Sequence, residues 1–100
     1  MKAVFGIRFK TDLLEAEERY SQISPRLAGS LRQRIAGQVR EIVRWRGGDH
    51  IGPHGFPCRR TKPFPYYIYY KVEGDTVYFL SLVHERRHPH FLKGSSKRER

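Results

Sequence analysis

Cysteine is nearly absent from this 100-residue sequence, in which Cys58 stands alone. One cysteine excludes an intramolecular disulfide and a zinc site built from several thiolates. The histidines are scattered, and none belongs to a His-Glu-x-x-His pattern. His50 and His54 have a spacing that suits chelation, but no third ligand is expected near them. We therefore predict neither a metal ion nor another cofactor.

Long apolar runs are also missing. No stretch approaches the ~20 apolar residues of a membrane-spanning helix, and residues 1–8 become charged too soon for a signal peptide. We therefore expect a cytoplasmic protein that has no membrane partner. No Gly-x-x-x-x-Gly-Lys-Ser/Thr loop precedes a helix, and no pair of carboxylates lies on the expected sheet. These absences argue against nucleotide-dependent catalysis and against catalysis by paired carboxylates.

Acidic residues are half as frequent as basic ones. Twenty Lys and Arg face ten Asp and Glu, which gives a formal net charge of +10. Residues 93–100 carry four bases and one acid, so residues 1–92 remain at +7 without them. A surplus of this size attracts polyanions and predicts a nucleic acid or an acidic protein as partner. The length suits one domain, which we place at residues 1–92, followed by a flexible basic tail at 93–100.

The first third of the chain predicts a strand and a helix. Residues 3–9 alternate apolar side chains with others, which is typical of a strand with one buried face. Apolar residues then recur at helical spacing over about 12–23. Thr11 or Asp12 would cap this helix, and Glu15 follows Asp12 at the spacing of a capping box.

A second helix is predicted directly after the first. Ser24 and Pro25 supply a cap and a first-turn proline, and glycines at 47 and 48 supply a stop signal. With so short a connection, the two helices should form an antiparallel hairpin. Gly29 and Gly37 lie inside the second helix, and we expect them to allow close packing against the first.

The second half of the chain predicts strands. Glycines and prolines keep residues 49–57 irregular, and residues 58–62 form a short strand. Residues 66–72 and 76–84 give the strongest strand patterns, joined by a tight turn at 73–75. The order strand–helix–helix–strand–strand–strand predicts an α+β domain in which the helical hairpin packs on one face of a mainly antiparallel sheet.

The turn sets which side chains share a face of this sheet. If Gly74 and Asp75 are the turn residues, Glu73 faces Thr76. One face, the predicted core, then holds Tyr66, Ile68, Tyr70, Val72, Val77, Phe79, Ser81 and Val83. The other, left open, holds Tyr67, Tyr69, Lys71, Glu73, Thr76, Tyr78, Leu80, Leu82 and His84. A slip of one residue in the hairpin would exchange the two faces.

The open face has side chains that suit an anionic partner. Tyrosine rings stack on bases or pack against apolar groups, while lysine and arginine hold phosphates or carboxylates. We predict that nucleic acid or an acidic protein segment contacts this face and the basic strand beside it, through Arg59, Lys62, Tyr67, Tyr69, Lys71 and Tyr78. The simpler alternative is an amphipathic sheet whose tyrosines only cover its surface.

A basic cluster follows the last strand and has the chemistry of RNA cleavage. Such cleavage needs a base for the 2′-hydroxyl, a cation for the phosphorane and an acid for the leaving oxygen. Candidates for these roles are His84, His88, His90, Arg60, Arg86 and Arg87. The alternative is structural: a histidine that bonds the backbone, and arginines that pair with Glu85 or with a partner's acids. Arginines along the second helix, at 32, 34, 40 and 44, are typical of a solvated face.

Two segments give the chain a family resemblance. They read FPYYIYY at residues 64–70 and VHERRHP at residues 83–89. Together with the first strand, the Ser-Pro-initiated helical hairpin and VEGD at 72–75, they resemble the RelE/ParE superfamily of type II toxins over about residues 4–92. The resemblance implies that fold and a growth-arresting toxin. It also implies an antitoxin partner that neutralises the toxin, often through an acidic segment, in a hetero-oligomeric complex.

The resemblance leaves two molecular targets. RelE-like members cleave messenger RNA on the ribosome, whereas ParE-like members poison DNA gyrase without nuclease chemistry. Arg60 matches the family's basic position before the FPY segment, and Arg87 or Arg86 matches the one after the last strand. Many relatives have arginine where this chain has Tyr67, so one phosphate-holding group of the nuclease branch is missing.

The sequence therefore favours the ParE-like function. The nuclease branch uses a tyrosine or histidine near its C-terminus as acid or base, and this chain has no clear equivalent, although His88 and His90 lie close. An mRNA endoribonuclease remains one alternative. A non-toxic relative that only binds a partner is the other.

Overall fold

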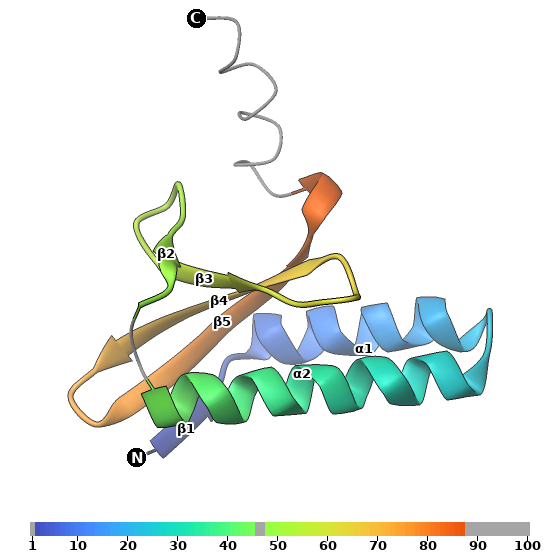
Figure 1. The fold of residues 1–100 in the computed structure, drawn as a ribbon, viewed down its shortest axis with the longest axis horizontal. Helices are drawn as coiled ribbons and strands as arrows, with labels where there is room; N and C mark the ends of the chain where they lie inside the picture. The colour runs from blue at the N-terminus through green and yellow to red at the C-terminus, as the bar shows by residue number, and fades with distance from the viewer. Residues whose placement is uncertain (1, 46–47, 88–100) are drawn as a thin grey trace, which may run out of the picture.

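The computed structural model describes residues 2–45 and 48–87 as two helices packed against a five-stranded sheet (Figure 1). In chain order the elements are β1 (Lys2–Phe5), α1 (Ile7–Ser21), α2 (Pro25–Trp45), β2 (His50–Ile51), β3 (Pro57–Arg60), β4 (Tyr66–Glu73), β5 (Thr76–His84) and the 3-10 turn η1 (Glu85–Arg87). The strand order is β1-β5-β4-β3-β2; β1 runs parallel to β5, and the other neighbours are antiparallel. The predicted α+β architecture is confirmed.

Two further predictions concern the absence of a membrane-spanning helix and the end of the domain at residue 92. Neither described helix is long and apolar enough to cross a membrane. The predicted domain end at residue 92 and the tail at 93–100 lie outside the described residues.

The first strand is shorter, and the first helix longer, than the sequence predicted. β1 ends at Phe5 and is exposed along its length, whereas the prediction was a half-buried strand to residue 9. Gly6 keeps an extended backbone and donates its N–H to the carbonyl oxygen of Phe79 at 3.0 Å, and α1 begins at the next residue. Phe9 lies in α1, and its side chain is buried in the core because its spacing to the inward-facing Leu13 and Ala16 is helical.

The capping box predicted at the start of this helix is wrong. Gly6 is the N-cap residue and makes no side-chain cap. Asp12 lies inside α1, where its Oδ2 accepts a hydrogen bond from the backbone N–H of Leu82 at 3.0 Å. The carboxylate therefore joins the helix to β5 instead of capping a helix end.

The predicted start of α2 is confirmed, but the expected role of its glycines is wrong. Ser24 Oγ accepts a hydrogen bond from the Leu27 N–H at 3.4 Å, and the helix ends at Trp45. A Cβ on Gly29 would meet no atom within 4 Å, and one on Gly37 would meet only Arg40 Nη2, at 3.8 Å. Neither glycine is needed for contact with α1.

Residues 49–57 contain a short hairpin strand that the sequence did not predict. His50 and Ile51 of β2 lie opposite residues 58 and 57 of β3. Between them the chain turns back tightly, with the Gly52 N–H donating to the Phe56 carbonyl at 2.8 Å and Gly55 at a φ of +85°. The glycines and prolines that suggested irregular structure form this turn. β3 itself ends at residue 60 instead of 62.

The turn between β4 and β5 has the predicted register, but further along β5 the side chains point to the faces opposite to those predicted. Glu73 pairs with Thr76, as expected, and Gly74 adopts a φ of +60°. Tyr70 pairs with Phe79 whereas Tyr69 pairs with Ser81, so the residue between these two β5 positions forms a bulge. An extra residue reverses the alternation of side chains beyond it.

The bulge corrects the predicted faces of β5. Leu82 and His84 turn toward the helices, while Ser81 and Val83 turn to the open face. The faces predicted for β4 hold, because the extra residue is in β5. The core between helices and sheet consists of Phe9, Ala16, Leu31, Ile35, Ile42, Phe64, Tyr66, Ile68, Tyr70, Val77, Phe79 and Leu82.

Candidate functional site

The open face of the sheet carries part of the predicted platform. Arg60, Tyr67 and Val83 lie opposite one another on three neighbouring strands, so they share this face. Further along, the ammonium of Lys71 lies 5.4 Å from the centre of the Tyr78 ring and 3.2 Å from a Glu73 carboxylate oxygen. Tyr67, Lys71 and Tyr78 are half-buried and therefore present surface on the predicted side. Their binding role stays a prediction.

Tyr69 lies on the same face but is covered, contrary to the prediction that it offers a ring for stacking. Only 5% of it is exposed. The turn after β2 packs on it so closely that a Cβ on Gly52 would lie 3.0 Å from ring atom Cε2. Burial raises the pKa of the Tyr69 hydroxyl to about 12, helped by its hydrogen bond with Cys58. Tyr69 thus supports the turn and offers no stacking surface.

Arg59 points to the helix side of the sheet and not to the open face, and its role in partner binding stays a prediction. Its Nε lies 3.0 Å from Asp49 Oδ1 and its Nη1 lies 2.8 Å from Glu41 Oε1. The hydroxyl of Tyr70 donates a hydrogen bond to the other oxygen of Asp49. Arg59 therefore joins β3 to α2 and to the segment that follows it, and Tyr70 joins β4 to the same segment.

Arg60, the next residue, is on the open side and forms an ion pair. Its Nη2 lies 2.6 Å from Glu85 Oε1, and the two side chains are only partly exposed. Lys62 is exposed in the bend after β3. The alternative that the arginines pair with Glu85 is thus realised at Arg60.

His84 is turned toward the helices. Its ring meets the Tyr66 ring edge-on at 5.2 Å, and its Nδ1 accepts a hydrogen bond from the Arg86 N–H at 3.1 Å. Burial lowers the pKa of His84, and the positive charge of Arg19 lowers it further. The imidazole is therefore neutral near pH 7.

Of the groups proposed for RNA cleavage, His84 and Arg87 line one groove, but Arg60 lies apart from His84 on the sheet. Arg60 shares the face of Val83, whereas His84, one residue further along β5, faces the other way. Arg86 and Arg87 are exposed in η1. His88 and His90 lie outside the described residues. Within residues 2–45 and 48–87, no three His, Cys, Asp or Glu side chains form a group that could hold a metal ion.

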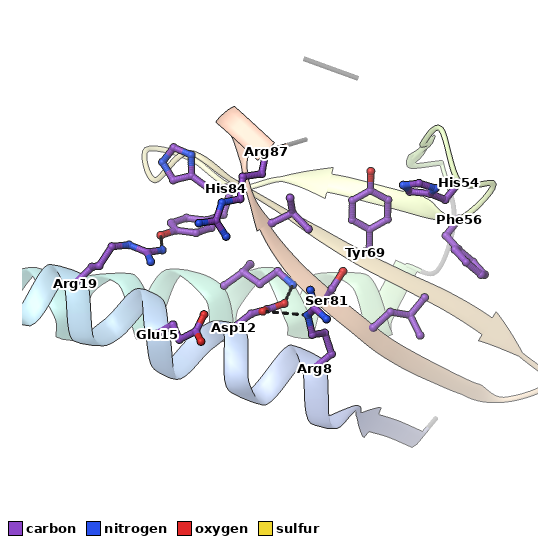
Figure 2. Close-up of a pocket in the computed structure, with 14 residues that line it drawn as sticks. Arg8, Asp12, Glu15, Arg19, His54, Phe56, Tyr69, Ser81, His84 and Arg87 are labelled. Carbon is purple, nitrogen blue, oxygen red and sulfur yellow. Dashed lines mark hydrogen bonds and ion pairs between the residues drawn. The ribbon is translucent and has the colours of Figure 1, made fainter. Parts of the chain in front are cut away.

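A groove of about 540 Å³ runs along the outer edge of β5, beyond the end of β1 (Figure 2). One wall is α1, which contributes Arg8, Asp12, Glu15 and Arg19. The other wall is formed by Tyr69 and by the turn after β2, with the side chains of His54 and Phe56. Arg87 and His84 close the end near η1. The groove therefore joins both faces of the sheet around one strand edge.

The sequence prediction missed this groove and its α1 residues. Arg8 Nε lies 3.4 Å from Asp12 Oδ1, and Arg19 Nη2 donates a hydrogen bond to the Tyr66 hydroxyl at 2.7 Å. The spacing of residues 8, 12, 15 and 19 puts them on one face of a helix. That pattern was hidden because residues 3–9 were predicted as a strand.

Comparison with known proteins identifies the class of fold. No protein-family model matches the sequence, and no curated protein matches it either. The fold is nevertheless similar to that of solved structures. One is a chain of the chromosomal ParDE toxin–antitoxin system from P. aeruginosa.

The likeness to that chain has a TM-score of 0.74 with 20% sequence identity. It covers 84% of this chain and 95% of the other. The predicted RelE/ParE toxin-like fold is therefore confirmed. At this level of identity the likeness is one of fold.

Proposed function

We propose that this protein is the toxin of a type II toxin–antitoxin pair, and that it arrests growth by binding DNA gyrase. An antitoxin with an acidic segment neutralises it in a hetero-oligomeric complex in the cytoplasm. Support comes from the fold, which is similar to a chain of a ParDE toxin–antitoxin system. It also comes from the net charge of +10, which suits an acidic partner.

The placement of Arg60 and His84 carries the choice of a gyrase inhibitor over a ribonuclease. A ribonuclease needs its acid, its base and its phosphate-holding cation around one phosphodiester. Here Arg60 and His84 face opposite sides of the sheet, and the guanidinium of Arg60 forms an ion pair with Glu85. This arrangement favours a protein that acts by binding over one that acts by proton transfer.

Expression in growing cells followed by pulse labelling tests the proposal. Shortly after induction, incorporation of labelled thymidine should fall while incorporation of labelled methionine continues. An early fall in protein synthesis would favour the ribonuclease alternative instead. Normal growth despite accumulation of folded protein would favour a relative that only binds a partner.

Variants of the open face extend the test. Tyr67→Ala and Lys71→Ala should each delay growth arrest, because both side chains present surface on the face proposed to contact gyrase. Arg34→Ala, an exposed residue of α2, is the matched control and should arrest growth like the parent chain.

A further inference from the structure

Two cations of the open face are paired with carboxylates of the same region. Arg60 Nη2 lies 2.6 Å from Glu85 Oε1, and Lys71 Nζ lies 3.2 Å from Glu73 Oε2. Both pairs bring one positive and one negative charge together, so their fields largely cancel at a distance. These two cations therefore have little uncompensated charge to offer to an outside polyanion.

The outer side of α2 carries arginines that have no such partners. Arg26, Arg40 and Arg44 are exposed, and none of them forms an ion pair within the described part of the chain. At 3.6 residues per turn their positions fall on one line along the helix, opposite to its buried apolar stripe. We call these three residues the arginine row. At a rise of 1.5 Å per residue the row is about 27 Å long.

The side chains between these arginines on the same side of α2 are small or polar. They are Gly29, Ser30, Gln33 and Gly37. A hollow of about 510 Å³ lies beside Gly37. A Cβ on Gly37 would meet only Arg40 Nη2, at 3.8 Å, so the fold itself leaves this space open. A partner can therefore approach the helix closely at Gly37.

We propose that the arginine row binds the phosphates of duplex DNA, with the outer side of α2 seated in the major groove. The inference goes beyond the proposed function and does not rest on it. Protein partners bury apolar and aromatic side chains at the centre of an interface, and this side of the helix has none between Arg26 and Arg44. Arginine, serine and glutamine are instead the side chains that contact phosphates.

The shape of a single exposed helix favours DNA over RNA. The major groove of B-DNA is about 12 Å wide and admits an α-helix. The major groove of duplex RNA is deep and narrow, so side chains cannot read it. Small residues at the middle of the row would let α2 enter the groove, while arginines toward both ends reach phosphates.

The arginine row and the open face lie on opposite sides of the molecule. Both helices pack on one side of the sheet (Figure 1), and the row points away from the core that they cover. DNA bound at the row therefore leaves the open face accessible to a protein. Arg34 is not part of the row, because its position on the helix is shared with Glu41.

Salt-dependent binding of the full chain to DNA tests this proposal. The probe is a fluorescent duplex of mixed sequence, about two helical turns long, and anisotropy measures the dissociation constant at several salt concentrations. Arg26→Gln, Arg40→Gln and Arg44→Gln should each weaken binding several-fold. Each should also lower the slope of log K against log salt concentration by about one, because one phosphate contact is lost.

Arg32→Gln is the matched control for these variants. It makes the same change of charge on the same helix, but Arg32 Nε lies 2.9 Å from a Glu17 carboxylate oxygen on the α1 side. Arg32→Gln should therefore bind DNA with the slope of the parent chain. Residues 93–100 are the same in every variant, so any contribution from them cancels in the comparison.

A variant without any change of charge tests the close approach. Gly37→Leu fills the hollow and should weaken DNA binding several-fold, because the side chain holds the duplex away from the helix. Gly37→Ala adds only a Cβ, which has room, and should bind almost like the parent chain. Circular dichroism shows whether each variant is folded.

Four results would overturn the inference. These are no binding of the duplex at low salt, equal losses for Arg32→Gln and Arg40→Gln, tighter binding of duplex RNA of the same length, or tighter binding of a polyglutamate peptide that Arg40→Gln abolishes. The last would make an acidic protein the partner of the row. Pulse labelling in cells does not depend on these measurements, so failure here and failure of the gyrase proposal are separate outcomes.

Discussion

Arg59 and Arg60 are adjacent in β3 but have different environments. The Arg59 side chain is 19% exposed and contacts two carboxylates from the helix side, whereas that of Arg60 is 37% exposed and contacts one on the open side. Removing one partner of a buried ion pair leaves the other charge without compensation, while an exposed pair contributes little. At the scale of single residues, position on the sheet decides which arginine is structural.

Alanine substitutions at these two positions should separate stability from function. We expect Arg59→Ala to lower the free energy of unfolding by about 2 kcal/mol, after allowance for its partial exposure. Arg60→Ala should lower it by less than about 1 kcal/mol. Urea denaturation measures both. Equal losses for the two variants would show that the ion pairs around Arg59 do not stabilise the fold.

His84 should make stability depend on pH. Burial and Arg19 lower its pKa in the folded protein below the ordinary value of 6.5, so the unfolded chain binds a proton more readily. Protonation therefore favours unfolding: this contribution destabilises the fold at low pH and disappears as the pH rises past 6.5. Glu85 acts in the opposite direction, and Arg86 and Arg87 act in the same direction as Arg19.

The measurement compares the parent chain with His84→Gln by urea denaturation between pH 5 and 8. The parent chain should gain stability over this range more steeply than the variant. Parallel curves would contradict the depressed pKa.

At the scale of helices and strands, the sequence predicted the type of most elements but not where the first two meet. Both a strand and a helix fit residues 3–9, because Phe9 is buried in either. In the structure the strand ends at Phe5, Gly6 still donates its N–H to the Phe79 carbonyl, and α1 begins at the next residue. That contact joins residues far apart in the chain, so local periodicity does not reveal it.

The bulge in β5 is the second feature that local patterns could not predict. The apolar residues of β5 fit either alternation, since Leu80, Leu82 and Val83 are all suitable for a core. Burial of Leu82 against Ile68 selects the bulged register. The same bulge turns His84 to the face opposite Arg60, so these two candidate residues are separated at the point where the predicted register of β5 was wrong.

Alanine substitutions at Gly29, inside α2, and at Gly48, just beyond its end, should change stability in opposite directions. Gly29 is in the helix with open space around it, so Gly29→Ala should raise the free energy of unfolding by about 1 kcal/mol. Gly48, just beyond the helix, has a φ of +80° that other residues rarely adopt, so Gly48→Ala should lower it by about 1 kcal/mol. Thermal denaturation by circular dichroism checks the signs. A loss of stability at Gly29 would mean that this position needs glycine after all.

At the scale of the whole molecule, charge and topology act together. The net charge of +10 suits an acidic partner, and the fold leaves a groove beside the outer edge of β5. The family resemblance in the sequence led to the correct fold. The groove was not predicted, because it needs both the earlier start of α1 and the end of β1 at Phe5.

Supercoiling of relaxed plasmid by purified DNA gyrase tests the central claim most directly. The purified chain, added in stoichiometric amounts, should inhibit supercoiling or trap cleaved DNA, and Arg60→Ala should act like the parent chain because no chemistry is assigned to Arg60. Unimpaired supercoiling, together with cleavage of ribosome-bound mRNA that Arg60→Ala abolishes, would contradict the account.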